Sequence, residues 1–164
     1  MMERCNLCPR NCNADRTNTI GYCKAGNEIR VARAALHFME EPCISGKTGS
    51  GTVFFSGCNL KCVYCQNYTI SHENFGKNIS VERLSDIFLE LQGQGAVNIN
   101  LVTAVMFVPL ILKALDRVKT ELRIPVVYNS SGYESKETLR MLEGYVDIYL
   151  TDIKYFQDPP AVRY

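Results

Sequence analysis

The sequence predicts an α/β fold built on a parallel sheet, and three observations support this. Four short apolar runs, rich in β-branched and aromatic residues, occupy residues 52–56, 97–102, 124–128 and 146–150. Helical patterns separate these runs, as expected for parallel strands joined by crossover helices. Each run is followed by small, polar or thiol-bearing residues. Because ligands of parallel sheets lie at the carboxyl ends of the strands, this edge is the expected functional site.

Local signals justify each element in turn. Residues 52–56 read TVFFS and lie between glycines, which is typical of a buried strand. Ser80 is the expected N-cap of the first helix. Pro109 can begin the second, since it fixes φ and lacks only an N–H that would be unpaired there. Ser135 is the expected N-cap of a third, shorter helix that ends near Gly144.

The first 43 residues differ from the rest of the chain. They are rich in Cys, Asn and Arg and have no long periodic apolar pattern, so we expect something other than a hydrophobic core to organise them. Four of their cysteines are closely spaced: Cys5, Cys8, Cys12 and Cys23. Metal binding would supply the folding energy, either as a structural tetrathiolate zinc or as an auxiliary iron–sulfur cluster for electron delivery. We therefore expect a Cys-rich metal-binding region at 1–43 and a core domain at 44–164.

Three more cysteines, Cys58, Cys62 and Cys65, lie in SGCNLKCVYCQN directly after the first strand. The N-terminus has no apolar stretch that could serve as a signal peptide, which favours a reducing, cytoplasmic setting over a disulfide framework. In that setting clustered thiols indicate metal. Structural zinc and iron–sulfur clusters usually have four protein ligands, so three thiols leave one metal position open. The alternative is a zinc site closed by a fourth cysteine such as Cys43, which we otherwise expect to be buried or incidental.

Charge and hydropathy exclude other classes of partner. The net charge is +1 and no long run of like charges occurs, so neither nucleic acid nor an anionic membrane is an expected partner. The longest apolar run, residues 104–112, is far shorter than the ~20 residues that span a bilayer. His37 and His72 are the only histidines, and neither has a cysteine at metal-ligand spacing. We expect surface or capping roles for both.

The Cys58 to Cys65 spacing, with Tyr64 just before the third cysteine, resembles the radical S-adenosylmethionine (SAM) superfamily. The resemblance implies a partial (βα) barrel, of which this chain has about four parallel strands. It also implies an oxidoreductase in which a 4Fe-4S cluster cleaves SAM reductively to a 5′-deoxyadenosyl radical for hydrogen abstraction. The three cysteines would ligate three irons, SAM would chelate the fourth, and Tyr64 would lie near the adenine.

Longer stretches resemble the glycyl-radical-enzyme activases, in particular proteins related to pyruvate formate-lyase activating enzyme. These stretches are GSGTVFFSGCNLKCVYCQN, VYNSSGY, DIYLTDIKY and the N-terminal CNLCPRNC with GYC. By this resemblance Lys154 holds the SAM carboxylate and Asp152 orients it or binds a cation; an ordinary solvated strand end is the alternative. Asn129 and Ser131, at the end of the third strand, complete the expected SAM-binding set. The implied partners are SAM, a glycyl-radical-type protein substrate and a flavodoxin or ferredoxin reductant, while further catalytic residues stay unassigned.

Two features depart from the superfamily pattern. The second strand often ends in a Gly-Gly-Glu type motif that holds the SAM amino group, whereas here Thr103 offers one hydrogen bond. The superfamily barrel also has more strand–helix units than this chain, so residues 44–164 resemble the N-terminal part of a truncated core domain. Its last strand would be an unpaired edge that a longer gene product or a partner must cover. The alternative function is a non-catalytic iron–sulfur or zinc-binding module, a truncated relic of such an enzyme.

Overall fold

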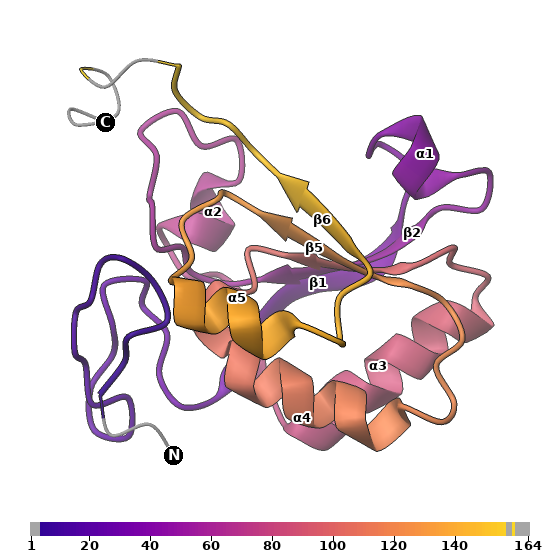
Figure 1. The fold of residues 1–164 in the computed structure, drawn as a ribbon, viewed down its shortest axis with the longest axis horizontal. Helices are drawn as coiled ribbons and strands as arrows, with labels where there is room; N and C mark the ends of the chain where they lie inside the picture. The colour runs from indigo at the N-terminus through magenta and orange to yellow at the C-terminus, as the bar shows by residue number, and fades with distance from the viewer. Residues whose placement is uncertain (1–3, 157–158, 160–164) are drawn as a thin grey trace.

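The computed structural model describes residues 4–156 and residue 159, and it is an α/β structure with a single twisted sheet (Figure 1). The strands are β1 (Ile29–His37), β2 (Ser50–Phe55), β3 (Lys77–Ile79), β4 (Ile99–Val102), β5 (Val126–Ser130) and β6 (Ile148–Thr151). The helices are α1 (Pro42–Ser45), α2 (Tyr68–Ser71), α3 (Val81–Gly93), α4 (Val108–Val118) and α5 (Lys136–Leu142), with a 3-10 turn at Val105–Phe107. Within the described residues, no helix is long and apolar enough to cross a membrane.

The sheet has the strand order β3-β1-β2-β4-β5-β6. Strands β2, β4, β5 and β6 are mutually parallel, which confirms the four predicted parallel strands. In register, Phe54 pairs with Val102 and Val102 with Asn129, so the carboxyl ends of these strands lie at one edge. The last described strand, β6, is the outer strand on that side.

Two antiparallel strands were not expected. Strand β1 pairs with both β2 and β3, although it lies within the first 43 residues. There Ile29 and Val31 are buried and join the main core, as do Leu7 and Ala25 further upstream. The expectation that this region has no core was therefore wrong. The sequence pattern does not indicate this strand, because its register shifts between Val31 and Arg33 and breaks the alternation typical of a half-buried strand.

Helix starts follow the predicted signals closely. The Ser80 hydroxyl accepts a hydrogen bond from the Arg83 N–H at the start of α3, and the Ser135 hydroxyl accepts one from Thr138 at the start of α5. Pro109 lies in the first turn of α4. These three helix starts are confirmed, whereas β5 begins at Val126, two residues later than expected.

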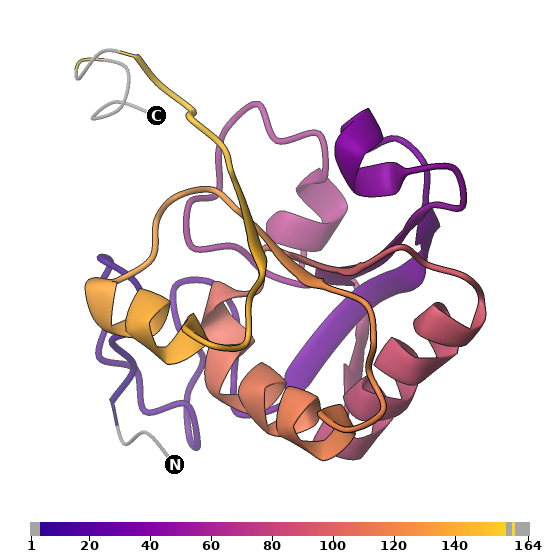
Figure 2. The same ribbon diagram turned by 45° about the vertical axis from the view of Figure 1, so that its right-hand side comes forward.

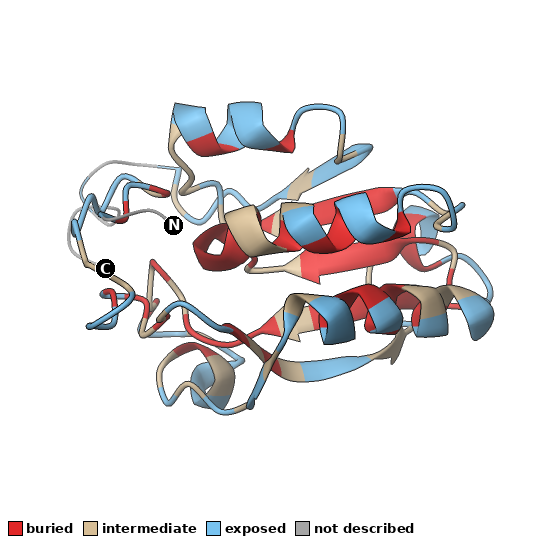
Figure 3. Ribbon diagram, turned by 90° about the horizontal axis from the view of Figure 1, so that it is seen from below, coloured by how far each residue is buried: buried red, intermediate tan, exposed pale blue. Residues whose placement is uncertain are grey.

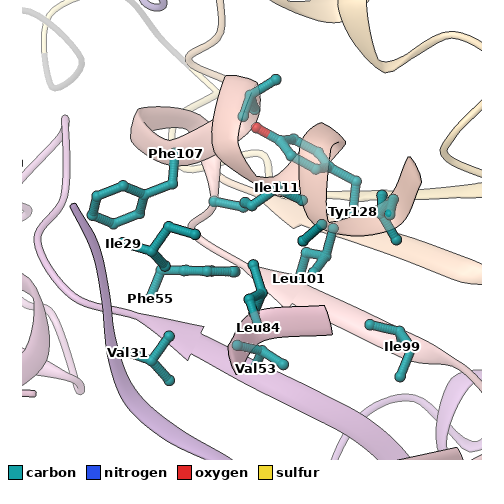
Figure 4. Packing of buried hydrophobic residues seen from close by; sticks show 14 of the residues in the cluster. Ile29, Val31, Val53, Phe55, Leu84, Ile99, Leu101, Phe107, Ile111 and Tyr128 are labelled. Atoms are coloured by element: carbon teal, nitrogen blue, oxygen red, sulfur yellow. The ribbon is translucent and has the colours of Figure 1, made fainter. Parts of the chain in front are cut away.

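Helices α3, α4 and α5 cover one face of the sheet, and α1 and α2 lie on the other side (Figures 1 and 2). The helix-covered face is lined by buried residues (Figure 3). Val53, Phe55 and Leu101 from the strands pack there against Leu84 of α3 and Ile111 of α4 (Figure 4). The main hydrophobic core therefore lies between the sheet and helices α3, α4 and α5.

Candidate functional site

A cleft of about 740 Å³ lies at the carboxyl ends of the parallel strands. Its volume is within the range usual for small-molecule sites. Eight residues singled out from the sequence are among those that line it: Cys58, Cys62, Tyr64, Cys65, Asn129, Ser131, Asp152 and Lys154. Residues from three separate stretches of the chain, 58–65, 129–131 and 152–154, therefore meet in one cavity.

The loop that carries the three cysteines begins at Gly57, and only glycine fits there. Its φ is +86°, and an added Cβ would lie 2.1 Å from the Cys23 carbonyl oxygen. Further along, Lys61 also has a positive φ, of 55°, and the Cys65 N–H donates to the Cys62 carbonyl at 3.1 Å. These turns fold the loop so that all three cysteines line the cleft.

Hydrogen-bond donors already point at two of the three sulfurs. The Leu60 N–H donates to Cys58 Sγ at 3.4 Å, and the Ser71 hydroxyl donates to Cys65 Sγ at 3.3 Å. Burial raises the pKa of the Cys58 thiol, and the N–H groups of Lys61 and Leu60 act in the opposite direction. Donors of this kind stabilise metal-bound thiolates, so the donor set suits a thiolate-ligated cluster.

All eight cysteines are free thiols, and Cys43 lies exposed on α1, outside the cleft lining. The structure thus keeps Cys43 apart from the loop cysteines. Within the part of the chain that the structure describes, no three Cys, His, Asp or Glu side chains close around a single metal ion.

At the β6 edge of the cleft, Lys154 Nζ pairs with Asp152 Oδ2. Both side chains keep solvent contact, with 32% of Lys154 and 55% of Asp152 exposed. The Tyr64 ring lies edge-on to the Tyr155 ring, with centroids 6.2 Å apart. Aromatic and charged groups therefore flank the thiols on the open side of the cleft.

Glu40 and His37 also line the cleft; Glu40 was not singled out from the sequence, and His37 was expected to have a surface or capping role. The Glu40 side chain is only 16% exposed; its carboxylate accepts a hydrogen bond from Asn129 Nδ2 at 3.3 Å and lies 3.9 Å from His37 Nε2. Burial raises the pKa of Glu40, and the nearby Glu41 carboxylate adds to the effect. No local sequence signal marks these residues, because the end of β1 and the connection to β2 carry His37 and Glu40 to Asn129, far along the chain.

The four N-terminal cysteines, Cys5, Cys8, Cys12 and Cys23, line a second and much smaller pocket of about 10 Å³. Arg16 donates to Cys23 Sγ at 3.8 Å. Burial raises the pKa of Cys5, whereas at Cys12 burial is outweighed by backbone N–H groups and Arg16, which lower the pKa. The chain therefore brings this group of thiols together as well, beside a cation.

Comparison with known proteins gives the family. The chain is 34% identical over 164 residues to the uncharacterized protein MJ0674 of Methanocaldococcus jannaschii, a match that covers 94% of this chain and 46% of the relative. It thus spans about half the length of that relative. No solved structure matches the chain. Residues 52–163, which include the three-cysteine loop and the parallel strands, match the Radical SAM superfamily, whose members in general use a 4Fe-4S cluster with SAM as co-substrate. The chain belongs to the Radical SAM superfamily.

Proposed function

We propose that Cys58, Cys62 and Cys65 hold a 4Fe-4S cluster and that the adjoining cleft binds SAM. The observation that carries the proposal is the common cleft: three thiols with the superfamily spacing share it with polar groups from the ends of β5 and β6. Three thiolates leave one iron without a protein ligand, which is the position a small molecule can take. When bound, the cluster supplies the electron that cleaves SAM and so generates a 5′-deoxyadenosyl radical for hydrogen abstraction.

The residues around the cleft would hold the cluster and orient SAM. The Leu60 N–H and the Ser71 hydroxyl stabilise the cysteine thiolates. The positive charge of Lys154 suits the SAM carboxylate. Asp152 would orient the Lys154 ammonium group or bind a cation. Asn129 and Ser131 offer hydrogen bonds at the end of β5, and the Tyr64 ring offers a stacking surface for adenine.

We further propose an activase of the type related to pyruvate formate-lyase activating enzyme. Its support is the extended sequence resemblance through residues 49–67, 127–133 and 147–155. The hydrogen would then come from a glycine Cα of a partner protein, with flavodoxin or ferredoxin as reductant. Eight free thiols suit a reducing cytoplasm.

For the N-terminal cysteines we propose a second metal centre, zinc or an iron–sulfur cluster, in a Cys-rich region over residues 1–43. Its support is the shared pocket of the four thiols. Residues 44–164 would then form the N-terminal part of the core domain.

The test is SAM cleavage by anaerobically reconstituted protein with dithionite as reductant, followed as released 5′-deoxyadenosine. Wild type and Cys43→Ala, which removes an exposed thiol outside the cleft, should release it, and Cys62→Ala should not. Reconstituted wild type that never releases the nucleoside would overturn the enzymatic proposal. If SAM also left the EPR signal of the reduced cluster unchanged, the chain would be a non-catalytic module instead.

A further inference from the structure

The two segments that carry the cysteines are in direct contact, although each group of thiols has its own pocket. Gly57, the residue before Cys58, packs so closely on the Cys23 carbonyl oxygen that a Cβ would lie 2.1 Å from it. Asn59, the residue after Cys58, lines the N-terminal pocket together with the four cysteines of that region. The loop around Cys58 is therefore held against the N-terminal region on both sides.

Arg10 provides the polar contacts at this junction between the N-terminal region and residues 57–60. It lies between Cys8 and Cys12, and its Nε donates to the Asn59 carbonyl at 2.8 Å, with a longer contact of 3.4 Å from its terminal nitrogen to the Leu60 carbonyl. Asn59 is almost fully buried, so its carbonyl has little access to water. Hydrogen bonds from a charged donor to such a group are among the stronger ones in proteins.

The ring of Tyr22 completes the junction. The Arg10 guanidinium lies over it at 4.0 Å, and Lys61 Nζ lies 4.4 Å from its centroid. Tyr22 precedes Cys23, and Lys61 lies between Cys58 and Cys62. Two cations, one from each cysteine-bearing segment, thus meet at the Tyr22 ring, where they would offset the repulsion of two anionic metal–thiolate centres.

One peptide unit connects Arg10 to the Cys58 sulfur. The carbonyl of Asn59 accepts from Arg10, and the N–H of the same peptide, that of Leu60, donates to Cys58 Sγ at 3.4 Å. A cation bound to a carbonyl polarises the peptide and strengthens the hydrogen bond that its N–H gives. Hydrogen bonds to sulfur favour the more negatively charged, reduced state of an iron–sulfur cluster.

We infer that Arg10 is a positioning residue for the cluster: it ties the N-terminal cysteine region to the Cys58 loop and, through the Asn59–Leu60 peptide, raises the reduction potential of the cluster. This inference rests on the proposed function, since it requires a cluster on Cys58, Cys62 and Cys65. Arg10 contacts none of the loop thiols and does not itself line the cleft, so its effect passes through the peptide, the Leu60 carbonyl and the packing.

The experiment compares wild type, Arg10→Gln, Arg10→Lys and the control Arg33→Gln, whose arginine is exposed on β1. EPR-monitored redox titration gives the midpoint potential, and loss of iron to a chelator gives the stability of the cluster. We expect a lower potential and roughly tenfold faster iron loss in Arg10→Gln, the size usual for outer-shell partners of metal ligands. Arg10→Lys keeps the charge but cannot donate to both carbonyls as the guanidinium does, so its potential and rate of iron loss should lie between those of wild type and Arg10→Gln. Arg33→Gln should match wild type.

Circular dichroism checks that each variant is folded. If Arg10→Gln does not fold, Arg10→Lys provides the test. A folded Arg10→Lys with the potential and the rate of iron loss of wild type would then overturn the inference. A folded Arg10→Gln that matches wild type in both would overturn it too, while leaving the proposed function intact. Wild type that holds no cluster after reconstitution would instead overturn both.

Discussion

The two groups of cysteines line cavities of very different size. The loop cysteines line a cleft of about 740 Å³ at the ends of parallel strands, beside charged and aromatic side chains. The N-terminal cysteines share a pocket of about 10 Å³, and Cys5 and Cys23 belong to the hydrophobic core. The loop cysteines thus line a cavity large enough for a small molecule, whereas the N-terminal cysteines, of which Cys12 is exposed, line a pocket too small for one. The packing around the thiols, more than the number of thiols, determines the size of the cavity beside them.

The difference gives each group a distinct proposed role. A group of four thiols suits a metal whose positions are all filled by protein, as in structural centres. An open group of three suits a metal centre that also binds a ligand. Contacts of Gly57, Arg10 and Tyr22 join the N-terminal segment to the loop that carries the other three cysteines.

Metal removal should distinguish the two groups most strongly. Exposed to a chelator in air, wild type should lose its cleft iron first and keep the N-terminal metal, because four thiolates fill the coordination positions of a metal whereas three leave one iron open to the large cleft. Timed samples analysed for iron, zinc and sulfide measure this. Simultaneous loss of both metals would show that the openness of the cleft does not control access.

Gly57→Ala should have the next largest effect, since it opens the contact between the two regions. The positive φ costs about 1–2 kcal/mol for a residue with a Cβ, and the overlap with the Cys23 carbonyl adds about 1–3 kcal/mol. Urea unfolding measures the loss. The matched control is Gly93→Ala at the end of α3, where no atom lies within 4 Å of the added methyl and stability should change little or rise. Equal stability of the two variants would contradict the close packing at Gly57.

Thr138→Val should loosen the N-terminal region from α5. The buried Thr138 hydroxyl donates to the Leu7 carbonyl at 2.8 Å, and losing this bond should cost about 1 kcal/mol. Ser80→Ala, which removes the N-cap of α3, should cost about as much. Hydrogen exchange tells the two apart, because only Thr138→Val should speed exchange around Cys5 to Cys23. Unchanged exchange there would mean that α5 does not hold this region.

Glu40→Gln should have the smallest effect, on the pH dependence of stability. Burial raises the pKa of Glu40 above its ordinary value of 4.5, so the folded state binds more protons than the unfolded state just above that pH. Stability should therefore fall as pH rises from about 4.5 through the raised pKa. The variant should lose part of this fall and keep the part due to Glu134, whose pKa burial also raises. Unfolding curves at several pH values measure the slope, and identical slopes in both proteins would contradict the burial of Glu40.

The parallel half of the fold follows from local signals in the sequence. Ser80, Pro109 and Ser135 each mark the start of a helix within their own few residues, and the apolar run before Gly57 marks β2. The gathering of the strand ends then follows from parallel topology alone. That is why residues as distant as Cys58 and Lys154 were expected in one place and lie in one cleft.

Other parts of the molecule depend on contacts that no local pattern reveals. The shift of register after Val31 hides β1, and pairing with β2 is what makes it a strand. Glu40 reaches the cleft only because the connection after β1 carries it to Asn129. Arg10 resembles any polar loop residue until the fold brings Asn59 beside it. Long-range packing, which sequence spacing does not encode, decides these three cases.

The central claim is that an open cluster rests on the three loop cysteines, and metal analysis tests it most directly. Iron, zinc and sulfide are measured in anaerobically purified wild type and in a variant with Cys58, Cys62 and Cys65 all changed to Ala. We expect wild type to carry about four irons with matching sulfide at the loop, and the variant to lose these and keep its N-terminal metal. Zinc alone in both proteins after attempted reconstitution, or iron and sulfide unchanged in the variant, would contradict the claim.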